Sequence, residues 1–372
     1  MKILYDHQAF SMQKYGGISR YFFEVIRGVQ KKQGFEIHLP IVLSANSYLK
    51  DLNTIQYRQL EYIAKGFNWL VAYINRYHTV QKFTDSSIPF DVFHPTYYDP
   101  YFLPYLSGKP YVLTIYDMIH EIFPDYFSPS SKTSEKKKRL AQAASLIIAI
   151  SENTKKDIIK IFGIKADKIR VIYLGVSPFS PVRDMNISIP GNFLLFVGQR
   201  YEYKNFLTLA ESIRKILIRN NLFLICFGGG SFTRKEMMTL RELDIADRVI
   251  FLSGNDQVLA YLYRSAIAYI CPSRYEGFGI PVLEAMSCGC PVVSSNVSSL
   301  MEVGGDAASY FVPHDKDSME EAVDRIVSDT SYRQALIERG FVQARKFTWE
   351  KTAAETSHVY KEALATNGSS GP

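Results

Sequence analysis

The sequence predicts an α/β protein built from two doubly wound domains, in which helices cover both faces of mostly parallel sheets. Short β-branched or aromatic runs alternate with longer amphipathic segments along the whole chain, which is the pattern of such sheets. A chain of 372 residues is also too long for one ordinary core, because single domains usually span roughly 100–200 residues. Residues 177–192 are rich in Pro, Ser and Asn, lack periodicity and are expected to form a linker. We therefore expect domains over residues 1–178 and 179–350. A C-terminal helix that could return to the first domain is expected within 351–372, followed by a disordered tail.

The order of expected elements supports this division. In the first domain, strands are expected over residues 2–6, 36–43, 91–95, 111–117, 146–151 and 170–175. Helices are expected there over residues 19–33, about 57–81, 139–144 and 152–162. Ser151 is expected to cap the last of these helices. In the second domain, strands are expected over residues 193–199, 222–230, 248–254, 266–273, 291–295 and 308–313. Helices are expected there over residues 205–217, 235–243, 280–288, 318–328 and 332–347.

Composition disfavours several classes of protein. Hydrophobic residues make up 47% of the chain and charged residues 22%, as in ordinary globular proteins. No run approaches the roughly 18 uncharged apolar residues that a membrane span needs, and the start MKILYDHQAF does not resemble a signal peptide, so we expect a cytoplasmic location. The four cysteines lack the spacing of a zinc site, and we expect buried free thiols.

The net charge of +6 is concentrated, and residues 132–140 hold the densest basic cluster. Such a cluster is usually a solvated helix face, but it could also meet an anionic membrane surface peripherally, at the inner face of the membrane. We expect no nucleic-acid partner, because no nucleic-acid motif accompanies the cluster.

Glycine and basic residues follow the first strand of each domain. Gly16 and Gly17 precede a helix after the first strand, where exposed amides could approach a ligand. The absence of GxGxxG there disfavours a dinucleotide dehydrogenase. In the second domain, Arg200 and Lys204 precede a helix, and this pair could hold a pyrophosphate beside the positive end of the helix dipole. Two surface cations beside a turn would give the same pattern.

The stretch SRYEGFGIPVLEAMSCGCPVV, residues 273–293, is the most informative part of the chain. It is expected to form a loop at the carboxyl end of a buried strand, followed by a helix with Pro281 at an early position. Glu276 lies in the loop and Glu284 in the helix, with seven residues between them. Carboxylates beside a phosphate-binding helix start need hydroxyl donors. The arrangement therefore suggests a ligand with a central pyrophosphate, a sugar at Glu276 and a ribose at Glu284.

This stretch resembles the E-x7-E signature of retaining glycosyltransferases of family 4. The resemblance extends to GQRYEYKN and KYGG, and it implies the GT-B fold, with two Rossmann-like domains that face each other across a cleft. It implies that Glu276 binds the hydroxyls of the donor hexose and Glu284 the nucleotide ribose. It assigns the amides of Gly277, Phe278 and Gly279 to the donor, Arg200 and Lys204 to its diphosphate, and Gly16 and Gly17 to the N-terminal glycine loop.

One segment departs from the family pattern. Many relatives have a His-Asp pair after the fourth strand, where this chain has Tyr116 and Asp117, with His120 three residues further on. Asp117 could bind the acceptor hydroxyl or take its proton, and His120 could hydrogen-bond to the transferred sugar. A capping Asp and a structural His remain the alternative. His94 is a weaker candidate of the same kind.

The resemblance implies a hexosyltransferase with a UDP-sugar or GDP-sugar donor, UDP-hexose and GDP-mannose being about equally credible. We expect neither a cofactor nor a metal ion, because Arg200, Lys204 and the helix start can carry the charge of the leaving diphosphate. The acceptor would be a glycan or lipid-linked saccharide in surface-polysaccharide biosynthesis. A glycoside hydrolase, a GT-B-type epimerase or phosphorylase, and a non-catalytic sugar-nucleotide binding protein are the alternatives. The aromatic-rich segment around Phe67, Trp69, Leu70 and Tyr73 is expected to pack into the core, although it could form an acceptor groove or membrane-facing surface.

Overall fold

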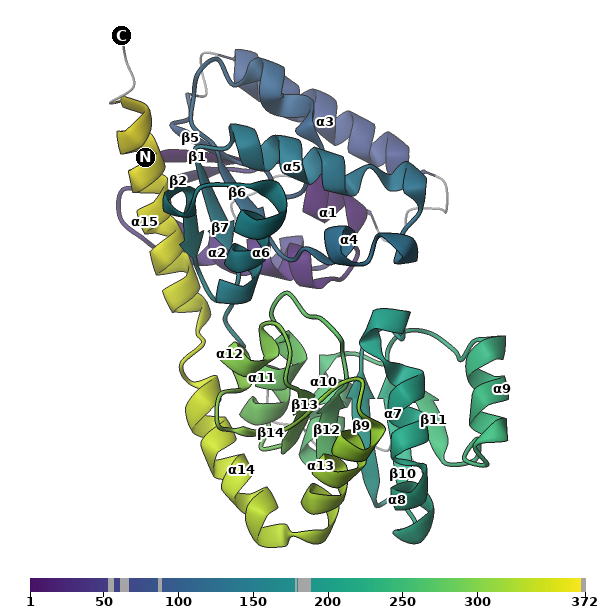
Figure 1. The fold of residues 1–372 in the computed structure, drawn as a ribbon. Helices are drawn as coiled ribbons and strands as arrows, with labels where there is room; N and C mark the ends of the chain where they lie inside the picture. Colours follow the sequence, from purple (N-terminus) through teal and green to yellow (C-terminus); the bar gives the residue numbers. More distant parts are fainter. Residues whose placement is uncertain (53–56, 61–66, 86–88, 178, 180–188, 369–372) are drawn as a thin grey trace. The chain divides into compact units, whose positions relative to one another are not determined.

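The fold comes from a computed structural model that describes all residues except 53–56, 61–66, 86–88, 178, 180–188 and 369–372. The chain divides into two compact units (Figure 1). Unit 1 contains residues 1–175 and 349–372, and unit 2 contains residues 176–348. Most of the expected linker, residue 178 and residues 180–188, lies outside the described residues, as does the end of the expected tail.

Unit 1 is built on parallel strands. Its first sheet has the order β2-β1-β5 and its second β6-β7-β8, and a bridge between Phe93 and Tyr111 connects β5 to the second sheet. The strands are β1 (Lys2–Tyr5), β2 (Glu36–His38), β5 (Val92–His94), β6 (Val112–Ile115), β7 (Leu146–Ala149) and β8 (Ile169–Val171). Strands β3 (Leu43–Ser44) and β4 (Arg58–Gln59) form a separate parallel pair. Because β2 lies on one side of β1 and β5 on the other, the order of the first sheet reverses between β1 and β5.

The helices of unit 1 include the C-terminal one. They are α1 (Gln8–Met12), α2 (Gly17–Gln30), α3 (Asn68–Thr84), α4 (Ile119–Ile122), α5 (Thr133–Ala143), α6 (Glu152–Phe162) and α15 (Trp349–Gly368). Short 3-10 turns are η1 (Tyr48–Asp51), η2 (Pro100–Tyr105), η3 (Pro124–Tyr126), η4 (Pro129–Ser131) and η5 (Ala166–Lys168). Helix α15 lies against α2 (Figure 1), and a Cβ on Gly28 would come within 2.4 Å of the Ala353 Cβ. The hydroxyl of Tyr360 lies 2.7 Å from Tyr5 Oη and 2.7 Å from His94 Nδ1, so the end of the chain is part of this unit's core.

Two expected elements of unit 1 are different in the structure. Residues 36–43 do not form one strand, because Pro40 lacks an amide hydrogen and separates β2 from β3. The helix expected over residues 57–81 begins only at Asn68, and Arg58 and Gln59 form strand β4 instead. Residues 61–66 of that expected helix lie outside the described residues.

Unit 2 holds one parallel sheet with strand order β11-β10-β9-β12-β13-β14. Its strands are β9 (Phe193–Val197), β10 (Phe223–Phe227), β11 (Val249–Leu252), β12 (Ala268–Cys271), β13 (Val292–Ser295) and β14 (Ala308–Phe311). Strands β10 and β11 follow on one side of β9, and β12 to β14 on the other. This is the doubly wound order, and its switch point, where ligands usually bind, lies between β9 and β12.

Helices cover the sheet of unit 2. They are η6 (Glu202–Lys204), α7 (Phe206–Ser212), α8 (Arg214–Arg219), α9 (Arg234–Glu242), α10 (Asp256–Ser265), α11 (Ile280–Ser287), α12 (Leu300–Gly304), α13 (Lys316–Ser328) and α14 (Thr330–Ala344). A large apolar cluster lies between the sheet and the helices, with Leu194, Ile216 and Ile270 completely buried. The expected helix over residues 205–217 is divided at Ile213 into α7 and α8.

Local sequence signals account for several helix boundaries. The Ser151 side chain accepts a hydrogen bond from Thr154 N and caps α6, as the sequence predicts. Asp315 caps α13 in the same way, through the amides of Asp317 and Ser318. All four cysteines are free thiols; Cys226, Cys271 and Cys290 are buried as expected, whereas Cys288 is half-buried.

Candidate functional site

The loops after β9 and β12 lie side by side at the switch point of unit 2. The Arg274 amide, after β12, donates to the Tyr203 carbonyl, after β9, at 2.7 Å. Arg274 Nε also donates to Asn205 Oδ1 at 3.2 Å, and Asn205 Nδ2 donates to the Pro313 carbonyl at 2.8 Å. These bonds fix the two loops that carry Lys204 and Glu276.

Lys204 and Glu276 form an ion pair between these loops. Lys204 Nζ donates to Glu276 Oε1 at 2.6 Å, and the two side chains are only 21% and 15% exposed. Burial disfavours the charged ammonium, but the Glu276 carboxylate outweighs this effect and raises the pKa of Lys204 above its ordinary value. Lys204 is therefore protonated at neutral pH, and it lies next to a carboxylate that could accept hydrogen bonds from hydroxyl groups.

Serine side chains hold the Glu276 loop in place. Ser273 Oγ donates to Glu276 Oε1 at 2.6 Å. The Glu276 amide donates to Ser298 Oγ at 2.9 Å, and Ser299 Oγ donates to the Glu276 carbonyl at 2.8 Å. Ser295 Oγ bonds to the Ser273 carbonyl at 2.5 Å. The sequence analysis did not identify these residues, although the serine-rich run at 294–299, which begins within the next strand, was a visible signal.

The loop that contains Gly277, Phe278 and Gly279 leads directly into α11. Gly279 is the N-cap, with φ +101°, and a Cβ there would come within 2.8 Å of the Leu300 side chain. Glycine is therefore required on both conformational and steric grounds. Glu284, in α11, is buried, and the Tyr263 hydroxyl donates to its Oε2 at 3.4 Å.

The Arg200 side chain is held by a carboxylate and by backbone carbonyl groups of unit 2. Its Nε donates to Glu236 Oε1 at 2.8 Å, and the two side chains are only 3% and 8% exposed. Its remaining nitrogens donate to the carbonyls of Gly228, Gly230 and Ser231 at 3.1, 2.7 and 3.0 Å. The Arg200 guanidinium therefore organises the glycine loop after β10, and its expected contact with a diphosphate beside Lys204 stays a prediction.

That glycine loop was also missed by the sequence analysis, which treated GGG as the end of a strand. Gly228, Gly229 and Gly230 all have positive φ. A Cβ on Gly229 would come within 2.8 Å of the Gly198 carbonyl oxygen, so this loop packs closely on the chain after β9. The three consecutive glycines were the signal.

In unit 1, the expected glycine loop lies at the start of α2. Gly16 is the N-cap, and a Cβ there would come within 2.3 Å of the Gln13 side chain. A Cβ on Gly17 would meet nothing within 4 Å, so this position is open on its Cβ side.

Asp117 and His120 lie near each other after β6. Asp117 Oδ1 accepts from the Ile119 amide at 3.0 Å, and the Asp117 side chain remains 31% exposed. The buried Lys137 ammonium donates to the Asp117 carbonyl and to Glu121 Oε2, both at 2.9 Å. His120 stacks on Phe127 with ring centroids 3.9 Å apart. Burial, together with the charge of Lys137, lowers the pKa of His120, so the ring is neutral at pH 7.

His120 Nδ1 is buried and has no hydrogen-bond partner among the described residues. His94, the weaker candidate, is instead completely buried. Its nitrogens bond to the hydroxyls of Tyr360 and Thr114 at 2.7 and 2.9 Å, so its role is structural.

A cavity of about 280 Å³ in unit 1 lies where the chain leaves the ends of β1 and β5. It is lined by His7, Gln8, Ser11, Met12, Ala72, Tyr97, Tyr98, Asp99, Ser131, Thr133 and Lys136. His7 is buried, and its Nε2 has no hydrogen-bond partner in the described part of the chain. Burial lowers the pKa of His7, so the ring is neutral at pH 7. The sequence analysis did not identify this cavity, whose wall comes from four separate segments.

The hydrogen-bond network indicates which nitrogen of His7 carries the proton. Ser11 Oγ lies 3.0 Å from His7 Nδ1 and accepts a hydrogen bond from Asn75 Nδ2 at 2.9 Å. Asn75 is oriented by the amides of Val42 and Leu43, which donate to its Oδ1. The Ser11 hydroxyl hydrogen is therefore best used toward Nδ1, which leaves Nε2 as an unpaired donor.

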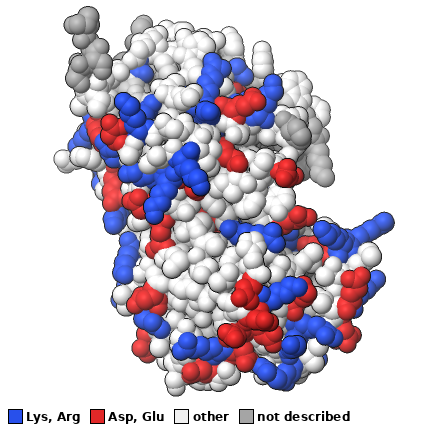
Figure 2. Space-filling model, in the orientation of Figure 1, with Lys and Arg blue, Asp and Glu red and all other residues white. Residues whose placement is uncertain are grey.

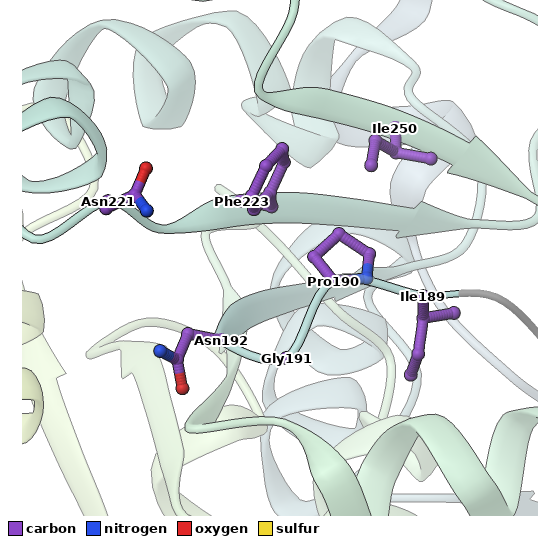
Figure 3. A pocket seen from close by; sticks show the side chains of 7 residues that line it. All are labelled: Ile189, Pro190, Gly191, Asn192, Asn221, Phe223 and Ile250. Carbon is purple, nitrogen blue, oxygen red and sulfur yellow. The ribbon is translucent and has the colours of Figure 1, made fainter.

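A second cavity, of about 490 Å³, lies at the opposite end of the unit 2 sheet. Figure 3 shows its lining, in which Asn192 and Asn221 lie just before the starts of β9 and β10. No ionisable side chain lines it, and ligands of doubly wound sheets bind at the carboxyl ends instead. We therefore do not assign it to the site.

The described residues contain no group of three or more His, Cys, Asp or Glu side chains that could hold a metal ion. No helix among them is both long enough and apolar enough to span a bilayer.

Two protein-family models match this chain, one over most of unit 1 and one over most of unit 2. A family model described as "Glycosyltransferase Family 4" matches residues 15–178, and one described as "Glycosyl transferases group 1" matches residues 184–343. The O-antigen chain mannosyltransferase B of Escherichia coli is 32% identical over 71% of this chain and 74% of its own length. The O-antigen chain mannosyltransferase RfbU of Salmonella typhimurium is 28% identical over 58% of this chain and 60% of its own.

Solved structures agree in fold. Sucrose-phosphate synthase from Thermosynechococcus elongatus superposes with a TM-score of 0.75 at 19% identity, over 98% of this chain and 99% of its own. WaaG, described as a glycosyltransferase involved in lipopolysaccharide biosynthesis, superposes with a TM-score of 0.70 at 16% identity, over 97% of this chain and 99% of its own. The expected GT-B class, with two doubly wound α/β domains, is confirmed.

Proposed function

The chain belongs to the glycosyltransferases of group 1 and family 4 and is a hexosyltransferase, and from this premise we propose that it transfers mannose from GDP-mannose to a hydroxyl of a lipid-linked saccharide. The observation that carries the proposal is the Lys204–Glu276 pair at the switch point of unit 2. Of the two donors left open by the sequence, GDP-mannose is favoured because relatives of this chain are named as mannosyltransferases.

On the donor side, the free protein holds Lys204 and Glu276 against each other. A nucleoside diphosphate offers the Lys204 ammonium a stronger anion, and the donor sugar offers hydroxyl groups to the Glu276 carboxylate. Donor binding would therefore exchange one internal ion pair for two contacts with the ligand, with Lys204 stabilising the charge of the leaving diphosphate. The amides of Gly277, Phe278 and Gly279 and the carboxylate of Glu284 are proposed to complete the donor site.

Arg200 is proposed to act indirectly. Its hydrogen bonds to Gly228 and Gly230 shape the glycine loop after β10, which lies against the chain leading to Lys204. It would position the diphosphate site rather than contact the ligand. This revises the role that the resemblance implied for it.

On the acceptor side, unit 1 offers four features that we propose to take part. The partly exposed carboxylate of Asp117 could accept the proton of the acceptor hydroxyl, and neutral His120 has an unpaired ring nitrogen for a sugar hydroxyl. The cavity beside His7 offers tyrosine rings, hydroxyls and one buried N–H donor, which suit a saccharide unit of the acceptor. Gly16 and Gly17 would let the backbone approach a ligand closely.

The chemistry is proposed to proceed with retention and without a metal ion. Retention is the outcome that the family resemblance implies. Lys204 and the start of α11 can carry the diphosphate charge electrostatically, which is why a metal ion is not required by the proposal.

The test is a thermal-shift series with GDP, UDP, ADP and GDP-mannose, each with and without EDTA. A ligand that binds only the native state at 100 times its Kd should stabilise it by about 2.7 kcal/mol. Stabilisation by GDP and GDP-mannose, unchanged by EDTA, would support the proposal. Stabilisation by UDP alone would show that the donor is a UDP-sugar and not GDP-mannose. Loss of the stabilisation in EDTA would show that donor binding needs a metal ion.

A further inference from the structure

Helix α3 carries its large aromatic side chains on the outside of unit 1. Trp69, Tyr73 and Tyr77 are 66%, 63% and 61% exposed, and the nearby Phe67 and Leu70 are exposed as well. The buried residues of the same helix are Val71, Asn75 and Thr79. The expectation that this aromatic segment packs into the core is therefore wrong for its largest members.

The two sets of residues occupy opposite sides of the helix. Each repeats every four residues, and Trp69 and Val71 are about 200° apart around the helix axis. The inner side is anchored by polar bonds, since Asn75 Oδ1 accepts from the amides of Val42 and Leu43 at 2.9 and 3.1 Å. Water thus meets the more apolar side of α3, an arrangement that is unfavourable unless something covers that side.

The composition of this face suits a membrane interface. Tyrosine and tryptophan have an apolar body and a polar tip, and both are enriched at the headgroup level of bilayers. Helix α3 contains no Asp or Glu. Its two cations, Arg76 and Lys82, have acidic neighbours within the unit, so they add little free charge.

Free positive charge comes from the adjacent start of α5. Lys132, Lys138 and Arg139 are exposed, and no ion pair joins them, or Lys136, to an acidic group in the described residues. The cavity beside His7 is lined by Ala72 of α3 and by Thr133 and Lys136 of α5, which places the two helices next to each other (Figure 1). Figure 2 shows uncharged areas interspersed with Lys, Arg, Asp and Glu side chains on both units.

We propose that α3, together with the basic start of α5, docks unit 1 onto a bilayer that contains anionic lipids. A second copy of the chain is a poorer occupant, because a symmetric contact through this face would bring two basic clusters together. An anionic bilayer complements both features, since aromatic side chains enter the headgroup region and lysines meet lipid phosphates. The inference deepens the proposed function, because a lipid-linked acceptor would be presented at that surface.

The test is sedimentation of the full chain with vesicles of phosphatidylcholine alone or with 30% phosphatidylglycerol. We expect binding to the mixed vesicles, and a loss of at least tenfold in the triple variant Trp69→Ser, Tyr73→Ser, Tyr77→Ser. The double variant Lys138→Gln, Arg139→Gln should lose roughly 25-fold on anionic vesicles, because each charge near such a surface contributes about fivefold.

Matched controls use other exposed residues. Lys156→Gln with Lys160→Gln on α6 removes the same charge from the same unit, and Met238→Ser on α9 removes an exposed apolar side chain; both variants should bind as the native chain does. Circular dichroism checks that each variant is folded.

Three results would overturn the proposal. These are no binding to either vesicle, equal loss in the control variants, or a dimer in light scattering that the triple variant dissociates. Vesicle binding needs no donor or transfer reaction, so its failure is distinguishable from failure of the proposed function.

Discussion

Replacing Glu276 by Gln should tighten the binding of GDP while greatly reducing sugar transfer. In the free protein, the carboxylate competes with any phosphate for Lys204, since Nζ donates to Glu276 Oε1 at 2.6 Å. The Gln amide oxygen can still accept a hydrogen bond from the charged Lys204 ammonium, so the variant loses only the attraction between the two opposite charges. For an ion pair that is not fully buried this attraction is up to about 1 kcal/mol, which corresponds to a roughly fivefold lower Kd for GDP.

Transfer should respond in the opposite direction. The amide of Gln cannot hold sugar hydroxyls as strongly as the carboxylate does, and losing one such transition-state contact typically costs 100- to 1,000-fold in kcat. The measurements are isothermal titration calorimetry with GDP and initial transfer rates from GDP-mannose. The variant Lys204→Met should lose both GDP affinity and transfer.

A matched control is Lys235→Met, which removes an exposed lysine paired loosely with Glu202 at 3.4 Å in the same unit. It should change neither quantity by more than about twofold. If Glu276→Gln bound GDP more weakly than the native chain, the competition between Glu276 and phosphate for Lys204 would be refuted.

Three further variants test parts of the fold that support the site. Arg200→Ala should destabilise unit 2 by about 3–5 kcal/mol in urea unfolding, because it leaves the buried Glu236 carboxylate without its cation; a fully stable variant with a large loss of GDP affinity would instead indicate direct ligand contact. Gly279→Ala should lower the free energy of unfolding by about 1–3 kcal/mol and reduce the transfer rate, because the residue has a φ of +101° and a Cβ there would contact the Leu300 side chain. Unchanged unfolding and transfer would contradict this predicted strain. Burial lowers the pKa of His94 from 6.5 to about 3, so the unfolded chain binds the extra proton below pH 6.5 and stability is lost as the pH falls from there toward 3. Between pH 7 and 5 this contribution is about 2 kcal/mol, and His94→Gln should show that much less acid destabilisation in paired urea titrations.

Periodicity and motif spacing were sufficient to predict the architecture of both units and the place of the Glu276 loop. The E-x7-E spacing, with Pro281 next to the helix start, predicted where α11 begins. Ser151 predicted its helix cap for the same reason, since a cap depends only on residues a few positions away.

Contacts between residues far apart in the chain could not be predicted from the sequence. Arg200 follows a strand just as a ligand-binding cation would, and nothing local shows that Glu236 and the glycine loop occupy its guanidinium. The cavity beside His7 was missed because its wall is assembled from distant segments.

Helix α3 shows a different limit. Its four-residue periodicity was visible, but periodicity does not say which side faces inward. From their hydrophobicity, Trp69 and Tyr73 were expected to face the core, but both are exposed. Hydrogen bonds to Asn75 hold the opposite side of the helix against the unit. The core expectation failed because a helix can be held by hydrogen bonds rather than by its most apolar face.

The most direct test of the central claim is to incubate the protein with GDP-mannose and a lipid-linked saccharide, in EDTA, and to determine the anomeric configuration of the product by NMR. We predict an α-mannosyl product, as retention of the donor configuration requires, at a rate at least 100-fold higher than with Lys204→Met. A β-linked product, or release of an altered sugar nucleotide without any use of the acceptor, would contradict the account.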